Sequence, residues 1–516
     1  MVWDILILVL FAAGMVAIAV ITAKKAKTSD DFLLAGKKGL NGWMSAFSYG
    51  TAYFSAVIFI GYAGKFGWNF GLASVWIGIG NAVFGSLLAW FILAKRTKNM
   101  TVRLGAKTMP DFFAKRYESP FLKKISAIVI FIFLIPYAAS VYNGLGNLFE
   151  ILFGINGTLI TVLLALLTAV YLVFGGYFAT SLSDFVQGII MLAGVVVMVA
   201  FFMANDSVGG FEVFGRLSDI DKGIFVGYGD GGFLSSPMVA LISLVLLTSM
   251  GVYGLPQTVH KYYTVRDKKA IKQGMIVSTV FALIVGFSAY FVGSFGRLFF
   301  PDGVPGGNTD NIIPLMLNKV IPSGLKGLIA VLVLSASMST LASVSLSASS
   351  VLAIDLLKGE GEKQKSDKQV TLMMRIICLS FVAISIVIAI LNKLYNITAI
   401  AYLMGLSWGT LSGCFFGPFV LGLYNKKLTK TAAISSVIGG LSLTVILILV
   451  FGALSTPSGA GLGAIIKAGV GQSPLIGVIC MIFSIIITLV VSQFTKRPSD
   501  EAIEEAFDKH IENEIV

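Results

Sequence analysis

Apolar stretches of about 20 residues recur along the whole of this chain. A segment of that length crosses the hydrocarbon core of a bilayer as an α-helix, which satisfies its backbone hydrogen bonds internally. Hydrophobic residues make up 56% of the 516 residues and charged residues only 12%, about half the charged fraction of soluble domains. The sequence therefore predicts an all-α membrane protein that crosses the bilayer many times.

The apolar stretches divide into about thirteen predicted transmembrane helices. The first is not expected to be a cleaved signal peptide, because it lacks a basic flank and a small-residue cleavage site. The predicted spans are 2–22, 41–64, 71–94, 125–153, 158–175, 178–204, 236–259, 273–300, 325–357, 371–392, 397–425, 431–453 and 473–495.

Lysine and arginine concentrate in alternate loops, whereas the intervening loop 205–235 leans acidic. Basic loops remain in the cytoplasm, so we expect a plasma-membrane protein with its amino terminus outside and its carboxyl terminus inside. The basic clusters are Lys24/Lys25/Lys27, Lys95/Arg96/Lys98/Arg103, Lys261/Arg266/Lys268/Lys269/Lys272, Lys426/Lys427/Lys430 and Lys496/Arg497.

Other function classes lack their sequence signatures. The net charge of +12 follows from this topology and does not indicate nucleic-acid binding. Cys378, Cys414 and Cys480 fall inside spans without paired spacing, and His260 and His510 are expected at the cytoplasmic surface, far apart. We find no nucleotide-binding or catalytic-triad pattern. We therefore expect a protein that is not an enzyme and has no obligate protein partner.

Residues 335–347 place a run of hydroxyl side chains inside an apolar span. Ala336, Ser339, Thr340 and Ser343 follow i, i+3, i+4, i+7 spacing, so they share one helical face. Hydrocarbon does not solvate hydroxyls, so this face needs a partner. It either packs closely on another helix or offers oxygen ligands to a hard cation such as sodium.

Two predicted spans are interrupted by polar residues and helix breakers. Residues 47–56 of the second span contain Gly50, and residues 248–257 of the seventh contain two glycines and Pro256. Such residues free backbone carbonyls. The breaks lie five spans apart, as expected for two inverted five-helix repeats that hold a substrate between their broken helices.

Four stretches carry a resemblance to a known family: Ser48–Gly61, Ser181–Gly188, Gly254–Lys261 and Met338–Ser343. The chain resembles the solute:sodium symporters, nearest their pantothenate/monocarboxylate and proline branches. The resemblance implies a LeuT-type 5+5 inverted repeat with discontinuous first and sixth core helices. The implied division is a first helix and loop (1–40), the first repeat (41–204), an outer loop (205–235), the second repeat (236–425), two peripheral helices (426–495) and a tail (496–516).

The resemblance also implies a sodium site between the second and ninth spans. Its implied ligands are the backbone carbonyls of Thr51, Phe54 and Ala336 and the hydroxyls of Ser339 and Thr340. About five neutral oxygens of this kind bind an ion weakly enough to release it in each cycle.

A second sodium site is left open by Asp184. Some family members use the matching acid with serines, here Ser339 and Ser343, but Ala342 stands where such members often carry a hydroxyl. Asp184 therefore either serves a second sodium ion or acts as a structural or gating hydrogen-bond acceptor.

The implied substrate cavity lies between the two breaks and contains no lysine or arginine. Hydroxyls, backbone amides at half-helix N-termini and the field of sodium would then hold a carboxylate. The residues expected to line it are Tyr53, Ser55, Tyr137, Tyr253, Gly254, Pro256 and Gln257, with Trp408 as an outer gate.

We therefore expect a sodium-coupled symporter that imports a small carboxylate-bearing solute, such as pantothenate, a monocarboxylate or proline, by alternating access. Its expected partners are the solute, sodium and the bilayer. A sodium/sugar symporter and a proton-coupled symporter of the same fold remain alternatives. A sensor would need an attached signalling module, and a channel would need a continuous polar pore lining.

Overall fold

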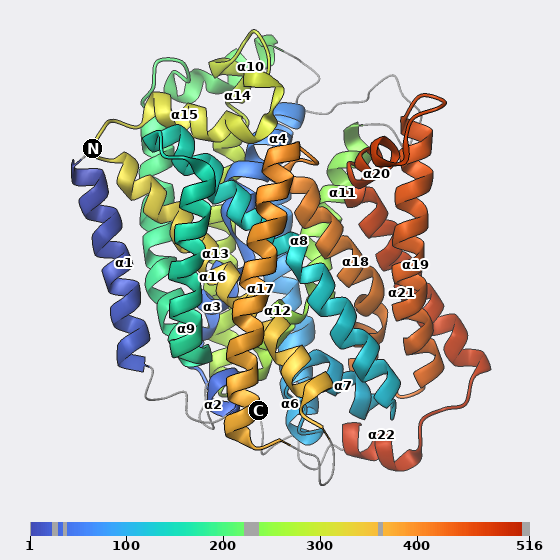
Figure 1. Cartoon of the computed structure of the whole chain (residues 1–516). Helices are drawn as coiled ribbons and strands as arrows, with labels where there is room; N and C mark the ends of the chain where they lie inside the picture. The colour runs from blue at the N-terminus through green and yellow to red at the C-terminus, as the bar shows by residue number, and fades with distance from the viewer. Residues whose placement is uncertain (1, 23–28, 35–38, 221–236, 360–364, 508–516) are drawn as a thin grey trace.

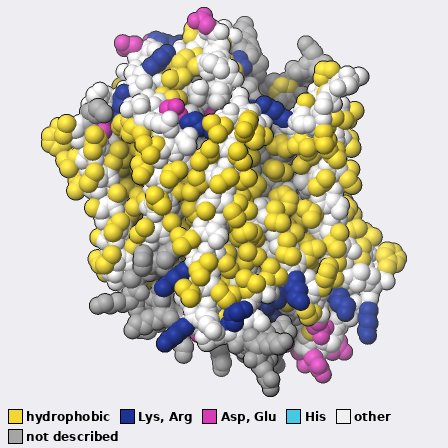
Figure 2. Space-filling model, viewed as in Figure 1, with side chains coloured by type: hydrophobic (Ala, Val, Ile, Leu, Met, Phe, Trp, Pro, Cys, Tyr) yellow, Lys and Arg dark blue, Asp and Glu magenta, His cyan; other side chains and the backbone are white. Residues whose placement is uncertain are grey.

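The computed structural model describes residues 2–22, 29–34, 39–220, 237–359 and 365–507. Within these ranges the chain is a bundle of helices, many of them running between two opposite ends (Figure 1). Figure 2 shows apolar side chains in a broad band around the middle of the bundle, with charged side chains gathered above and below it. The prediction of an all-α membrane protein is confirmed. The predicted outer loop 205–235 and tail 496–516 fall in part outside the described residues.

The helices of the first half of the chain are short at several places where the sequence breaks. They are α1 (Val2–Thr22), α2 (Ser29–Leu34), α3 (Gly42–Tyr53), η2 (Val57–Tyr62), α4 (Ala63–Phe70), η3 (Gly71–Ser74), α5 (Val75–Ala82), η4 (Val83–Leu88), η5 (Trp90–Ala94), α6 (Lys95–Arg103), α7 (Met109–Arg116), α8 (Pro120–Phe153), α9 (Gly157–Met203), α10 (Val213–Ile220) and α11 (Pro237–Met250).

The second half contains longer continuous helices. They are η9 (Gly251–Gly254), α12 (Pro256–Tyr263), α13 (Lys268–Gly293), α14 (Gly296–Phe299), η11 (Thr309–Asn311), α15 (Ile312–Val320), α16 (Lys326–Ser350), η12 (Val351–Leu357), α17 (Asp367–Tyr395), α18 (Ile400–Val420), α19 (Lys430–Ser455), α20 (Leu462–Val470), α21 (Ser473–Phe494) and α22 (Asp500–Phe507).

Eleven segments of the described chain are long and apolar enough to cross a membrane. Two of the thirteen predicted spans are not among these eleven segments as separate helices. Gly157–Val170 is a shorter apolar helix, and Gly176 (φ +60°) kinks α9 after it. The segment Val57–Arg103 combines the end of the second predicted span with the third, and Gly71 (φ +53°) turns the chain between them.

Both expected helix breaks are present. Asn41 caps α3 by accepting a hydrogen bond from the Met44 amide, and the helix ends at Tyr53, after which the backbone of Phe54 is extended (ψ 125°). In the seventh predicted span, α11 passes through the 3-10 turn η9 into Leu255, which is also extended (ψ 120°). Pro256 then starts α12, a position where its missing N–H costs nothing. The discontinuous first and sixth core helices are confirmed.

The hydroxyl-rich helix α16 lies at the centre of the bundle. Every residue from Ile329 to Ser350 is buried, and the helix packs against α3, α8, α9 and α17. The peripheral pair α19 and α21 packs on α18 at one side (Figure 1). A Cβ on Gly409 of α18 would lie 2.9 Å from the Cα of Gly477 of α21, so small residues allow these two helices to approach closely.

Candidate functional site

The hydroxyl face of α16 meets the carbonyl end of α3. Ser339 Oγ donates to the Thr51 carbonyl at 2.9 Å and lies 3.0 Å from the Ala336 carbonyl. Thr340 Oγ1 lies 3.2 Å from the Ala52 carbonyl and 3.1 Å from the Ala336 carbonyl. We call this group of neutral oxygens the oxygen junction. It unites four of the five expected sodium ligands.

The fifth expected ligand, Phe54, is not joined to Ser339 or Thr340 by these hydrogen bonds. The second carbonyl from α3 is instead that of Ala52, which sequence reasoning did not single out. The reason lies in where α3 ends. The last four carbonyls of a helix lack helical partners, and an end at Tyr53 places Thr51 and Ala52 in that last turn.

The second half of the broken helix is tied to α16 as well. Ser337 Oγ accepts a hydrogen bond from the Ala56 amide at 3.1 Å and donates to the Val333 carbonyl at 2.6 Å. This contact satisfies an amide that the break leaves without a helical partner. The position of the break is therefore held from both sides by α16.

Asp184 lies in a separate cluster of charged groups. Its Oδ2 accepts a hydrogen bond from Ser48 Oγ at 2.6 Å, and Lys261 Nζ lies 2.8 Å from Ser48 Oγ and 3.5 Å from Asp184 Oδ2. Both charged side chains are buried, with 0% of Asp184 and 2% of Lys261 exposed. The prediction that placed Lys261 in a cytoplasmic loop and His260 at the cytoplasmic surface is wrong, because both lie in α12, which turns their side chains into the bundle.

Ser343, the other residue expected near Asp184, is buried, and its Oγ has no hydrogen-bond partner among the described residues. The contacts of Asp184 therefore run to α3 and α12. Nothing in them links Asp184 to the oxygen junction on α16. The structure keeps the formal charges and the neutral oxygens as two distinct groups.

A small cavity lies between the broken helices. Its volume is about 10 Å³, roughly the space of one water molecule, so the site is closed around no more than a water. Three expected residues line it, namely Tyr53, Ser55 and Trp408. The remaining lining residues are Ile58, Tyr62, Asn81, Thr248, Tyr290 and Met404.

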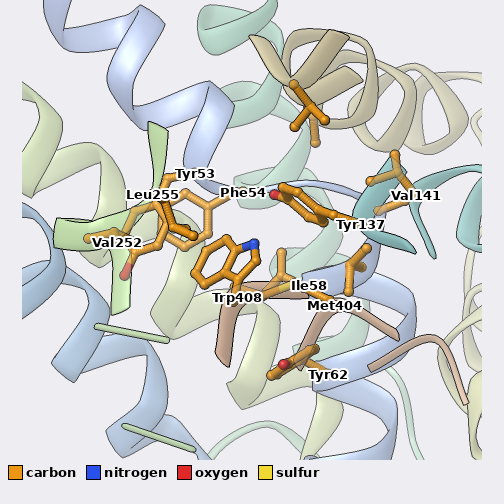
Figure 3. Close-up of a cluster of buried hydrophobic side chains, with 14 of the residues drawn as sticks. Tyr53, Phe54, Ile58, Tyr62, Tyr137, Val141, Val252, Leu255, Met404 and Trp408 are labelled. Carbon is orange, nitrogen blue, oxygen red and sulfur yellow. The ribbon is translucent and has the colours of Figure 1, made fainter. Parts of the chain in front are cut away.

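Three of the aromatic residues that line this cavity, Tyr53, Tyr62 and Trp408, lie in one cluster of buried side chains (Figure 3). The Trp408 indole stacks on the Tyr53 ring at a centroid distance of 6.1 Å and meets the edge of Tyr137 at 5.6 Å. The Tyr137 hydroxyl lies within hydrogen-bonding reach of Ser55 and Thr340. Tyr137 thus joins the cavity to the oxygen junction, because Thr340 belongs to that junction.

A model of the sodium:solute symporter family matches residues 32–440. The chain belongs to the sodium:solute symporter family. It is 29% identical to the sodium/pantothenate symporter of Haemophilus influenzae, over 83% of this chain and 87% of that protein. It is also 29% identical to the osmoregulated proline transporter of Bacillus subtilis, over 92% of each chain.

A sodium/proline symporter of Staphylococcus aureus is 28% identical to this symporter, over 96% of this chain and 94% of that protein. The solved structure of a sodium-coupled sialic acid symporter, in a substrate-bound outward-open state, has a TM-score of 0.76. It covers 96% of this chain and 99% of that chain at 20% sequence identity. The predicted family, its LeuT-type fold and sodium as its ion are thereby confirmed.

Four residues expected in the substrate cavity of the symporter lie elsewhere. Tyr253 donates to the Phe84 carbonyl at 2.7 Å, and its ring stacks on Phe416 at 5.7 Å. Gly254 faces the backbone of α18, where an added Cβ would lie 3.0 Å from the Cα of Ser412. None of these four residues, Tyr253, Gly254, Pro256 and Gln257, lines the small cavity.

Two tyrosines that line the cavity were missed. The hydroxyls of Tyr62 and Tyr290 are buried and have no hydrogen-bond partner among the described residues. A phenol inside an apolar span is a usable signal, because its hydroxyl needs a partner. A third missed residue, Asn81, accepts hydrogen bonds from Thr248 at 2.8 Å and Ser249 at 3.2 Å.

A larger opening lies toward the end of the bundle that carries α20, at the top of Figure 1. A cavity of about 710 Å³ there is lined by Phe66, Phe70 and Tyr402. Tyr402 also lines an adjoining cavity of about 460 Å³, together with Lys65 and Lys467. This end therefore offers a basic approach to the bundle.

Proposed function

We propose that this symporter imports a small carboxylate-bearing solute, of the class of pantothenate, monocarboxylates or proline, in step with sodium. The observation that supports this most strongly is the oxygen junction, which adjoins the small cavity through Tyr137. A sodium ion would replace the hydrogen bonds that Ser339 and Thr340 now donate, as their hydroxyls turn a lone pair toward the ion. The Phe54 carbonyl remains a predicted ligand.

The preference for a carboxylate has two supports. The relatives are named for pantothenate and proline, and the structural neighbour for sialic acid, all of which carry a carboxylate. Lys65 and Lys467 in the outer opening would raise the local concentration of anions. Inside the cavity, the hydroxyls of Tyr62 and Tyr290 offer neutral donors that bind the solute without trapping it.

We propose further that the end of the bundle carrying α6, α7 and α22 faces the cytoplasm. Lysine and arginine side chains follow the lower edge of the apolar band in Figure 2, and basic residues favour the cytoplasmic side. In this orientation the opening near α20 is extracellular. The amino-terminal end of α1 is then extracellular too.

Uptake into proteoliposomes tests the proposed function. Purified symporter is given labelled proline, pantothenate, short monocarboxylates and glucose, each with an inward sodium gradient or with potassium only. We expect sodium-dependent accumulation of at least one carboxylate and none of glucose. Accumulation of glucose instead, or carboxylate uptake that follows a proton gradient without sodium, contradicts the proposal.

A further inference from the structure

An ion pair with both side chains buried joins Asp184 of α9 and Lys261 of α12. We infer that Lys261 is a built-in cation that takes the place a second sodium ion would need beside Asp184, so that the symporter binds a single sodium ion. This inference rests on the proposed sodium site at the oxygen junction. To that proposal the inference adds the number of sodium ions bound, one, and the residue that prevents a second from binding, Lys261.

The geometry shows a cluster with balanced charge. Ser48 Oγ, at the cytoplasmic half of α3 in the proposed orientation, lies between the two charged groups, 2.6 Å from Asp184 Oδ2 and 2.8 Å from Lys261 Nζ. A carboxylate buried in an apolar bundle requires a nearby cation. The ammonium group of Lys261 already supplies one positive charge, so the cluster is neutral without any ion.

Lys261 is also held in place by an aromatic ring. Its Nζ lies 5.2 Å from the centre of the Tyr177 ring, a distance at which a ring attracts a cation. The residue before it, His260, packs its ring edge against Tyr177 at 5.0 Å. The ammonium group is therefore fixed over Asp184 and Ser48.

A sodium ion on the same carboxylate would lie within a few ångströms of this ammonium group, and two like charges at that distance repel strongly in a buried site. The second oxygen, Asp184 Oδ1, is buried without a hydrogen-bond partner among the described residues. This oxygen becomes available to an ion once the lysine charge is removed. The oxygen junction is formed by other residues and is unaffected.

The test is equilibrium binding of radioactive sodium to the purified full-length protein in detergent, without solute. We expect about one sodium ion for the wild type and about two for Lys261→Met, which leaves Asp184 without its cation. Lys261→Arg, which keeps the charge, should remain at one. Lys261→Met combined with Asp184→Asn removes both charges and should return to one.

Two sodium ions on the wild type, or one on Lys261→Met, would overturn the inference while leaving the proposed function intact. No sodium on the wild type would instead remove the proposed sodium site itself. If Lys261→Met is too unstable for binding measurements, the dependence of its melting temperature on sodium concentration is measured instead. A melting temperature that rises more steeply with sodium concentration in the variant than in the wild type supports the inference. An equal rise in both proteins contradicts it.

Discussion

The oxygen junction and the Asp184–Lys261 pair both contact helix α3, but they balance charge in different ways. Thr51 and Ala52 present neutral carbonyls to α16, whereas Ser48 joins two formal charges that neutralise each other. Neutral oxygens hold a cation weakly enough to release it, and a satisfied ion pair has no need of one. The comparison teaches that two sites a few residues apart on α3 differ in net charge, and this difference is what assigns the proposed sodium site to the neutral oxygens.

The largest effect should come from breaking the ion pair. Asp184→Asn leaves the Lys261 ammonium buried without a counter-charge, and removing one partner of a buried pair costs about 3–5 kcal/mol. We expect a much lower melting temperature and slower uptake, with the sodium dependence unchanged. The double variant Asp184→Asn/Lys261→Met should recover most of the stability. A single variant as stable as the wild type would show that the pair carries no such role.

A second buried acid sharpens the contrast, because no lysine of the described residues forms a salt bridge with it. Asp310 accepts a hydrogen bond from the Ile400 amide at the start of α18. Burial raises its pKa to about 6, although the Ile400 hydrogen bond and the charge of Lys65 lower it. The folded state thus binds the proton more tightly than the unfolded state, whose pKa lies near 3.8. Stability should fall as pH rises through about 6.

Asp310→Asn keeps an acceptor for the Ile400 amide and removes the titration. Relative to the wild type, this variant should gain about 1.4 kcal/mol of stability between pH 5 and 7.5, nearly all of it below pH 7. Melting temperatures measured across this pH range give the difference directly. A constant difference between the two proteins would show that the Asp310 carboxyl does not titrate there.

The smallest effect should come from the small cavity between the broken helices. Tyr62→Phe and Tyr290→Phe each remove one hydroxyl that lacks a partner in the closed cavity. Loss of a single hydrogen bond to solute, worth about 1 kcal/mol, should raise the solute concentration for half-maximal uptake about fivefold. Tyr142→Phe, which removes a buried tyrosine hydroxyl outside the cavity lining, serves as the control. The same solute concentration for half-maximal uptake in all three variants would exclude the two tyrosines from solute binding.

Much of this architecture can be predicted from the sequence. Apolar length predicts the spans, and the glycine and proline patterns predict both breaks, because these features act within a single segment. The pairing of Ser339 with the Thr51 carbonyl was predictable as well. Helical spacing places Ser339 on the hydroxyl face of its helix, and the resemblance to a family indicated the Thr51 carbonyl as its partner.

The remaining features depend on contacts between distant segments. Lys261 follows a basic pattern typical of a loop, and its partner Asp184 is 77 positions away. Whether Tyr253 faces the cavity depends on how η9 rotates as it enters α12, which no local pattern specifies. The role of Ala52 depends on the residue at which α3 ends. The Phe54 carbonyl and the assignment of the repeats stay predictions.

The central claim is that the oxygen junction binds the sodium ion that drives transport. Its most direct measurement is the sodium affinity of Ser339→Ala/Thr340→Ala, from sodium binding and from the sodium dependence of uptake. Loss of two ligand oxygens at about 1 kcal/mol each should weaken sodium tenfold or more. Ser345→Ala, a buried serine on the same helix whose Oγ has no partner in the described chain, should match the wild type. Wild-type sodium affinity in a well-folded double variant would contradict the account.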